Sequence, residues 1–363
     1  MLNISDFPKT IYSGDYPTGH CQGIAVDTKN RVIYYSFTTQ LVKTDFDGNF
    51  LGSVGGLLGH LGCIQFRASD GLVYGSLEYK NDAIGRGILQ RNNAESIENA
   101  FYIAVFDGEK ITRADMDAEK DGIMTAAFLS RVTDDYLGTD KNGCEHILGC
   151  SGIDGTAIGP MPGDKDGREW LFVCYGVYSD VNRTDNDHQV LLRYDPDEIK
   201  ANAAPISQNA MHKQGADMSY EVFFVYTGNT NWGVQNLDYD PARNVYMMCV
   251  YTGKKECFPN YPMYVIDASK APVMMPLAGR DGEEGYCFAL ADGNIRDEKT
   301  GISGTTYPHG NTGIASLGSA KNDADDSDVA YYYVSYDGRS ERGCNTTVRL
   351  CRADRDAWIV PVE

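Results

Sequence analysis

The sequence predicts an all-β protein in which one structural unit occurs five times. The chain is rich in glycine and tyrosine, with 39 and 24 residues among 363, and only 23% of its residues are charged. Short runs of β-branched and aromatic residues alternate with turn residues throughout, a pattern that favours strands over helices. We expect a single domain over residues 1–363, because closed all-β folds often reach this length.

Each unit opens on a first strand that leads into a turn. The turns are rich in Asp, Asn, Gly and Pro, whose backbone preferences and side-chain hydrogen bonds favour chain reversal. In the fifth unit this turn is KNDADDSD, at 321–328. The first strands are GIAVD (23–27), CIQFRA (63–68), GTAIGP (155–160), GVQNLDYD (233–240) and GIASLG (313–318).

Second and third strands follow in the same order in every unit. The second strands carry the β-branched and aromatic residues that suit a pleated surface: RVIYYSFT, GLVYGSLEY, WLFVCYGVY, NVYMMCVYT and VAYYYVSYD. The third strands run into Asp-containing turns: QLVKTDFDGN, FYIAVFDGE, QVLLRYDPDE, PMYVIDASK and TVRLCRADRD.

Outer fourth strands are predicted for four units, at FLGSV, IMTAAFL, EVFFVYTG and VMMPLAG. For the fifth unit two segments compete. KTIYSG (9–14) resembles the segment that precedes the fourth unit, and AWIVPVE (357–363) lies at the other end of the chain. A ring of sheets hides its edges when a strand from the opposite terminus completes the last sheet. We expect one of the two segments to pair outermost, and the sequence leaves open which.

This strand order resembles a five-bladed β-propeller with four-stranded blades, and the resemblance covers almost the whole chain. WD dipeptides and kelch-type glycine pairs are missing, so no specific family is identified. The resemblance extends to propeller-fold carbohydrate-active enzymes and implies that glycosidic-bond cleavage is to be expected. The blades fall at about 20–56, 60–130, 152–229, 231–279 and 309–363, with 9–14 a candidate to complete the last.

First strands line the central channel of such a fold, and their starts open on the face that receives the long loops. Long loops on one rigid face are where binding and catalysis are most often placed. We therefore expect polar side chains from all five blades to converge at this mouth: His20, Gln22, His60, Asp154, Asn231, Trp232 and His309.

Three interpretations of this polar ring stay open. The side chains could bond one another and ordered water. Alternatively, His20, His60 and His309 could hold one divalent metal, such as zinc, manganese or iron, completed by Gln22 or Asp154. In the third interpretation one histidine shuttles a proton and the others orient a substrate, without metal.

The ends of the second strands add aromatic and charged side chains to the same rim. Aromatic rings pack on the CH faces of sugars while polar groups bond hydroxyls, so a carbohydrate substrate is expected. The substrate-binding candidates here are Tyr79, Lys80, Tyr178, Tyr251, Lys254, Tyr336 and Arg339, together with the carboxyl of Glu78.

The resulting hypothesis is a carbohydrate-active enzyme that cleaves or eliminates across a glycosidic bond in a small glycoside or oligosaccharide. As a glycoside hydrolase it would use Asp154 and Glu78 as its acid and base pair. As a lyase it would neutralise a uronate carboxylate with a metal or with Lys80 and Arg339, while a histidine or tyrosine removes the adjacent proton. The alternative is a non-catalytic propeller that binds a small ligand or a protein partner.

Charge and cysteine content limit the partners and the compartment. The net charge of −19 disfavours nucleic acid and anionic membrane as ligands. No apolar window is long enough to span a membrane and no signal peptide is evident, so a cytoplasmic protein is expected. The ten cysteines are then expected to be reduced. The sequence leaves the oligomeric state open.

Overall fold

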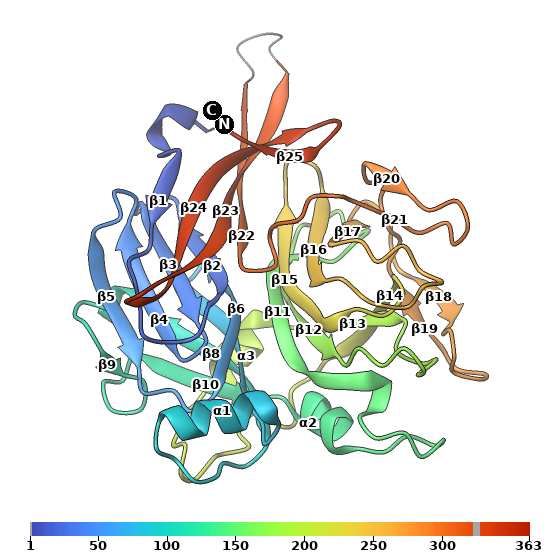
Figure 1. Cartoon of the computed structure of the whole chain (residues 1–363), viewed down its shortest axis with the longest axis horizontal. Helices are drawn as coiled ribbons and strands as arrows, with labels where there is room; N and C mark the ends of the chain where they lie inside the picture. The colour runs from blue at the N-terminus through green and yellow to red at the C-terminus, as the bar shows by residue number, and fades with distance from the viewer. Residues whose placement is uncertain (1, 322–326) are drawn as a thin grey trace.

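Five sheets surround a common centre in the computed structural model, which describes residues 2–321 and 327–363 (Figure 1). The fold is a five-bladed β-propeller, as predicted. The innermost strands are β2 (Cys21–Asp27), β6 (His60–Arg67), β11 (Cys150–Pro160), β15 (Asn231–Asp240) and β22 (Ile314–Lys321). These are the five first strands that the sequence predicts. The Asp-rich part of the fifth turn, at 322–326, lies outside the described residues.

The remaining strands build each blade outward by antiparallel pairing. Sheet one adds β3 (Val32–Phe37), β4 (Gln40–Asp45) and β5 (Phe50–Gly55), with the short parallel β9 (Met116–Asp117) at its edge. Sheet two adds β7 (Leu72–Tyr79), β8 (Ala100–Asp107) and β10 (Met124–Phe128). Sheet three adds β12 (Glu169–Val177), β13 (His188–Tyr194) and β14 (Glu221–Tyr226).

Sheet four has three strands, β15, β16 (Val245–Tyr251) and β17 (Met263–Asp267), and its predicted fourth strand is elsewhere. The segment VMMPLAG forms β18 (Val273–Pro276), which pairs with β19 (Glu284–Cys287), and β19 runs parallel to β14 in sheet three. The prediction was wrong because aromatic packing holds this hairpin on sheet three: the ring of Phe288 stacks on that of Phe223 at 4.7 Å.

Both chain ends complete the fifth blade, which contains β22, β23 (Asp328–Ser340) and β24 (Gly343–Asp354). β1 (Thr10–Tyr12) pairs with residues 347–349 of β24, and β25 (Trp358–Pro361) pairs with residues 351–354 of the same strand. The two segments that compete in the sequence therefore share one edge. Figure 1 shows the N- and C-termini side by side above this blade.

Helices are confined to the connections. They are α1 (Ala83–Arg91), α2 (Ser130–Leu137), α3 (Pro196–Asn202) and the 3₁₀ turns η1 (Ile4–Asp6), η2 (Gly108–Lys110) and η3 (Ile147–Gly149). A last small hairpin joins β20 (Ile295–Arg296) to β21 (Ser303–Gly304). Among the described residues, none of the helices has the length and apolar character needed to cross a bilayer.

The core lies between neighbouring blades, where tyrosines such as Tyr35, Tyr74 and Tyr102 are completely buried. A repeated polar contact joins successive blades near the axis. Ser36 Oγ on β3 donates to the Gly62 carbonyl at 2.6 Å, and Ser76 Oγ on β7 donates to the Asp154 carbonyl at 2.6 Å. These bonds fix the first strands of neighbouring blades relative to each other, and hence the side chains at their mouths.

Candidate functional site

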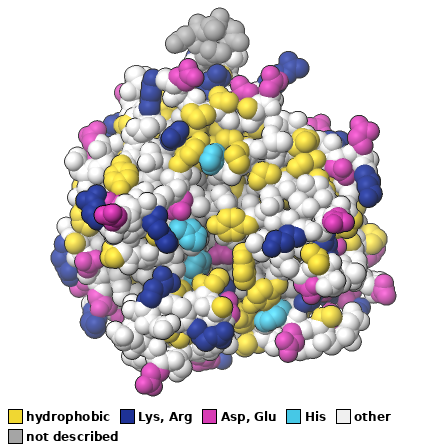
Figure 2. Space-filling model, in the orientation of Figure 1, with side chains coloured by type: hydrophobic (Ala, Val, Ile, Leu, Met, Phe, Trp, Pro, Cys, Tyr) yellow, Lys and Arg dark blue, Asp and Glu magenta, His cyan; other side chains and the backbone are white. Residues whose placement is uncertain are grey.

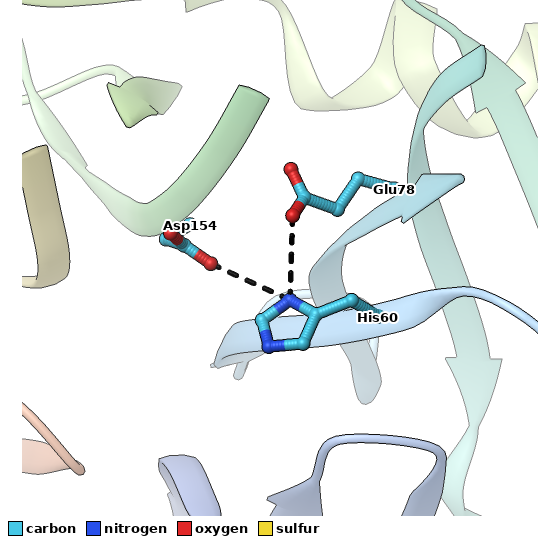
Figure 3. Close-up of side chains that lie close together, drawn as sticks. All are labelled: His60, Glu78 and Asp154. Carbon is cyan, nitrogen blue, oxygen red and sulfur yellow. Dashed lines mark ion pairs between the residues drawn. The ribbon is translucent and has the colours of Figure 1, made fainter. Parts of the chain in front are cut away.

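Three side chains from two blades meet at the channel mouth. His60 is the first residue of β6, and Glu78 lies directly opposite it on β7. β11 of the next blade brings Asp154 alongside (Figure 3). His60 Nδ1 is 3.6 Å from Glu78 Oε1 and 3.5 Å from Asp154 Oδ1.

Bulges at the starts of the inner strands aim these side chains. The ladder between β11 and β12 shifts register twice, around Gly152 and again between Ile153 and Thr156, and β6 shifts between Leu61 and Ile64. A bulge turns side chains out of the regular alternation. Gly152 has φ 127°, and a Cβ there would lie 2.0 Å from Glu78 Oε2, so no other residue fits beside this carboxylate.

Glu78 is held inside the protein by an ion pair. It is only 2% exposed, and its Oε1 lies 2.5 Å from the Lys80 ammonium, which is 5% exposed. Its Oε2 accepts from the backbone N–H of Ile153 at 2.9 Å. Burial raises the pKa of Glu78 and the charge of Lys80 opposes that rise. Burial would lower the pKa of Lys80, but the charges of Glu78 and Asp82 hold it above its usual range.

Asp154 and His60 each have a buried atom without a hydrogen-bond partner, Oδ1 and Nδ1 respectively. The other Asp154 oxygen accepts from Gln235 Nε2 at 3.1 Å. Burial, and then the charge of Glu78, raise the pKa of Asp154 well above its usual value. Burial, and then the charge of Lys80, lower the pKa of His60 to about 3. Asp154 therefore keeps its proton to a higher pH than an ordinary carboxyl, beside an imidazole that is neutral at neutral pH.

The same three groups could hold a metal. Among the described residues they form the one set of three His, Cys, Asp or Glu side chains with ligand atoms within 4.8 Å of one another. One imidazole nitrogen and two carboxylate oxygens suit a transition metal or Mn²⁺. However, the Lys80 ammonium already contacts Glu78 Oε1, so a cation there would face a positive charge at close range.

His20 and Tyr251 come from blades one and four to the same mouth. The Tyr251 hydroxyl lies 3.5 Å from His20 Nε2. Burial lowers the pKa of His20; the charge of Asp337 opposes this and that of Arg339 adds to it. Burial, and then the charges of Asp154 and Asp337, raise the pKa of Tyr251 to about 12. The charges of two carboxyl groups from different blades thus act on Tyr251. Figure 2 shows histidine side chains gathered in a central hollow of this face.

His309 lies apart from this group. Its ring packs on Tyr336 at 4.1 Å and on Tyr307 at 5.6 Å, and Arg349 covers the ring of Tyr336. It does not belong to the set of close ligand atoms, which contains Glu78 and Asp154 in its place. Of the three histidines expected to share a metal, His60 alone belongs to this set of close ligand atoms.

Other predicted binding residues divide between the surface and the interior. Tyr178, Asn231 and Trp232 are half-buried at the mouth, while Lys254 and Arg339 are exposed. Gln22 is buried, and its amide lies 3.4 Å from Thr38 Oγ1. Two further predicted binding residues, Tyr79 and Lys80, are buried behind the rim. The Tyr79 hydroxyl donates to Gln208 Oε1, and its side chain is fully buried. The Lys80 ammonium pairs with Glu78 and donates to the Ser151 carbonyl.

The rings of Tyr136, His146, Tyr178 and Trp232 form an aromatic wall near Asp154. Tyr178 and Trp232 were predicted as binding residues, but the sequence analysis missed His146, because it lies in a long connection rather than in a strand. The ring of His146 is 4.9 Å from Tyr136 and 4.9 Å from Tyr178, and Tyr178 is 5.6 Å from Trp232. One signal was present: like His20, His146 precedes the first strand of its blade. Gln235 was also missed, although it lies in the predicted strand GVQNLDYD.

Backbone strain accompanies this wall. His146 and Leu148 both have φ 59°, and Trp232 has φ 67°. Positive φ is unusual for bulky residues and costs about 1–3 kcal/mol each. Such strain is concentrated at functional sites, where the surrounding structure enforces it.

No protein-family model matches the chain, and the search of curated proteins finds no significant relative. Two of the solved structures that it resembles are a pyranose dehydrogenase PQQ domain from Coprinopsis cinerea and a GH43 β-1,3-galactosidase with galactodeoxynojirimycin. The first has a TM-score of 0.36 and 12% identity, covering 90% of this chain and 81% of that one. The second has a TM-score of 0.38 and 9% identity, covering 97% and 99%. TM-scores this low support no argument about chemistry, so the chemistry of the site is argued from its own geometry.

Proposed function

We propose that the protein is a carbohydrate-active enzyme that cleaves a glycosidic bond of a small glycoside or oligosaccharide in the central funnel. One observation carries the proposal. Asp154 is a buried carboxyl with a raised pKa, and one of its oxygens has no hydrogen-bond partner. A carboxylic acid kept protonated at neutral pH is the group that cleavage of a glycosidic bond requires for its leaving oxygen.

The pKa values of Asp154 and His20 are displaced in opposite directions, which assigns their roles. Asp154, whose raised pKa favours the protonated form, acts as general acid. His20 has a lowered pKa and is neutral, so it can accept a proton as general base beside Tyr251. A pair of groups displaced in this way is what acid and base catalysis at one pH needs.

Glu78 does not serve as the second carboxyl group of the reaction, because it is buried and paired with Lys80. It is a positioning residue that lies 3.6 Å from His60 Nδ1 and whose charge adds to the effect of burial in raising the pKa of Asp154. In hydrolysis, water attacks the anomeric carbon while His20 takes its proton, and Asp154 protonates the departing oxygen. In elimination, His20 takes a carbon-bound proton instead, and Asp154 again protonates the departing oxygen as the C–O bond breaks.

The test is an activity screen with product masses. The purified chain is incubated with aryl glycosides and with neutral and uronate oligosaccharides. Products whose summed mass exceeds that of the substrate by one water indicate hydrolysis. An unsaturated product, with a summed mass equal to that of the substrate, indicates elimination. Asp154→Asn and His20→Gln should each lower kcat by about 100-fold or more. Asp238→Asn is the matched control, since Asp238 is also a buried inner-strand carboxyl, with a pKa raised to about 8 by burial.

Asp238→Asn should leave the rate unchanged, with thermal unfolding showing that all variants fold. Binding of a glycan that remains intact would overturn the enzyme proposal in favour of a non-catalytic propeller. Full activity in Asp154→Asn would remove the acid role.

A further inference from the structure

The aromatic wall is one side of a groove that opens beside the funnel. The groove is a cavity of about 610 Å³ whose lining includes Glu145, His146, Tyr178, Asp180, Asn182 and Arg183. This volume is within the range of about 300–1,000 Å³ typical of small-molecule sites. Figure 2 shows hydrophobic side chains next to the histidines of the central hollow.

Contacts within the protein connect the lining of the groove to Asp154. Gln235 Nε2 donates both to Asp154 Oδ2, at 3.1 Å, and to the carbonyl of Trp232, at 3.0 Å. Tyr178 contacts Trp232 on one side and His146 on the other. Burial raises the pKa of Tyr178 while the charge of Lys80 opposes it, so this ring also borders the Glu78–Lys80 pair. A short series of contacts, through Trp232 and Gln235, therefore separates the Tyr178 ring from Asp154.

His146 is oriented for polar recognition as well as for stacking. Its Nδ1 donates to the Tyr136 carbonyl at 2.6 Å. Because a carbonyl only accepts, Nδ1 carries a proton, and Nε2 is the ring nitrogen available to a ligand. The strained backbone at His146 and Trp232 fixes both rings in place before a ligand arrives.

The charges around the groove select against acidic ligands. Glu145 and Asp180 are exposed carboxylates at its rim. The one guanidinium in the lining, that of Arg183, is paired with Asp185 and donates to the Glu145 carbonyl. A uronate would meet these carboxylates without an available cation, whereas neutral hydroxyls can donate to them.

We propose that this groove binds the second ring of a neutral oligosaccharide, stacked on Tyr178 and His146, while the adjacent glycosidic oxygen lies at Asp154. This deepens the proposed function and rests on it: the substrate is a disaccharide or longer, built of uncharged sugars. Stacking of sugar CH faces on the rings supplies the contact, and His146 Nε2, Glu145 and Asp180 accept from hydroxyls.

The experiment measures binding separately from cleavage. The Asp154→Asn chain, labelled with a fluorophore, is applied to an array of neutral and uronate glycans of one to six units, and dissociation constants of the bound glycans are measured in solution. Binding should require at least two units and exclude uronates. In this background Tyr178→Ala should weaken binding by about tenfold or more, and Tyr178→Phe should restore it because the ring is retained.

The control is Tyr12→Ala, which removes an exposed tyrosine far from the funnel in sequence, on β1, and should not change binding. Four outcomes would each overturn the inference. They are equal affinity for monosaccharides and longer glycans, a preference for uronates, the absence of all glycan binding, and unchanged binding in Tyr178→Ala. Binding of intact glycans with this aromatic dependence, without cleavage by the wild type, would overturn the proposed enzyme activity alone. Cleavage that is independent of Tyr178 would overturn the subsite alone.

Discussion

Lys80 balances the charge of the candidate site at the scale of single residues. It contacts Glu78 Oε1, donates to the Ser151 carbonyl and lies 3.6 Å from Asp82. The pair is almost completely desolvated, so each charge depends on the other. This explains why a lysine that the sequence suggested as a substrate ligand acts within the protein instead.

Replacing Lys80 should therefore cost stability. Lys80→Met leaves Glu78 buried without its partner, and we expect the free energy of unfolding to fall by about 3–5 kcal/mol. In Glu78→Gln/Lys80→Met both charges are gone, and most of the loss should be recovered. Urea denaturation of the wild type, of Lys80→Met, of Glu78→Gln and of the double variant measures this as a double-mutant cycle. A cost below about 1 kcal/mol for Lys80→Met, the range of surface pairs, would show that the pair is solvated.

Asp154 and His20 predict the pH dependence of activity. Activity requires protonated Asp154, so kcat/KM should fall as pH rises through its pKa, which lies well above that of an ordinary carboxyl. It also requires neutral His20, whose pKa is lowered, so activity should fall on the acid side only below the usual histidine range. A pH–rate profile measures both limbs. An alkaline limb that persists unchanged in the residual activity of Asp154→Asn would assign it to another group.

Asp238 predicts a pH dependence of stability. Burial raises its pKa to about 8 in the folded protein. An acid with a raised folded-state pKa binds its proton more tightly when folded, so stability falls as pH rises from about 4 to about 8, by up to about 1.4 kcal/mol per unit. Asp238→Asn should flatten this decline. Thermal unfolding at pH 5 and pH 8 compares the two proteins, and an equal decline in both would contradict the assignment.

At the scale of elements, short strands and bulges place the site and close the ring. β1 contains three residues, of which Ile11 is buried while Thr10 and Tyr12 are exposed. Its pairing with β24 covers an edge that would otherwise be free to pair with another chain. Bulges lie at the starts of the inner strands β2, β6, β11 and β15. They turn side chains toward the channel mouth.

The closing strand can be tested with adjacent residues of β1. Ile11→Ala removes buried contacts with the fifth blade and should lower the free energy of unfolding by about 2–5 kcal/mol. Thr10→Ala, in the same strand but exposed, should change it by less than about 0.5 kcal/mol. Equilibrium denaturation in urea gives both values. Equal, small effects would mean that β1 does not contribute to closing the propeller.

At the scale of the whole molecule, the cysteines report on packing and oxidation state together. All ten are free thiols; eight are buried, and Cys144 and Cys257 are exposed. We expect about two thiols to react quickly with a thiol reagent in the native protein, and all ten after denaturation without reductant. A denatured count of two or fewer would mean that the protein is oxidised. A native count near ten would mean that the blades do not exclude the reagent.

The sequence by itself determined the five repeated units, their strand order and the convergence of His20, His60, Glu78 and Asp154 at one mouth. Those features follow from local patterns, since strand residues and turn residues recur in register with the repeat. Only the tertiary structure decided the rest. Bulges and packing between blades decide whether Lys80 faces a ligand or Glu78. They also decide whether His309 joins the other histidines or stacks on Tyr336, and whether His146 lines the site. The same reason explains why β18 belongs to sheet three and why segments from both termini pair with β24. The pairing of a strand depends on contacts between segments distant in sequence, and no local pattern records those contacts.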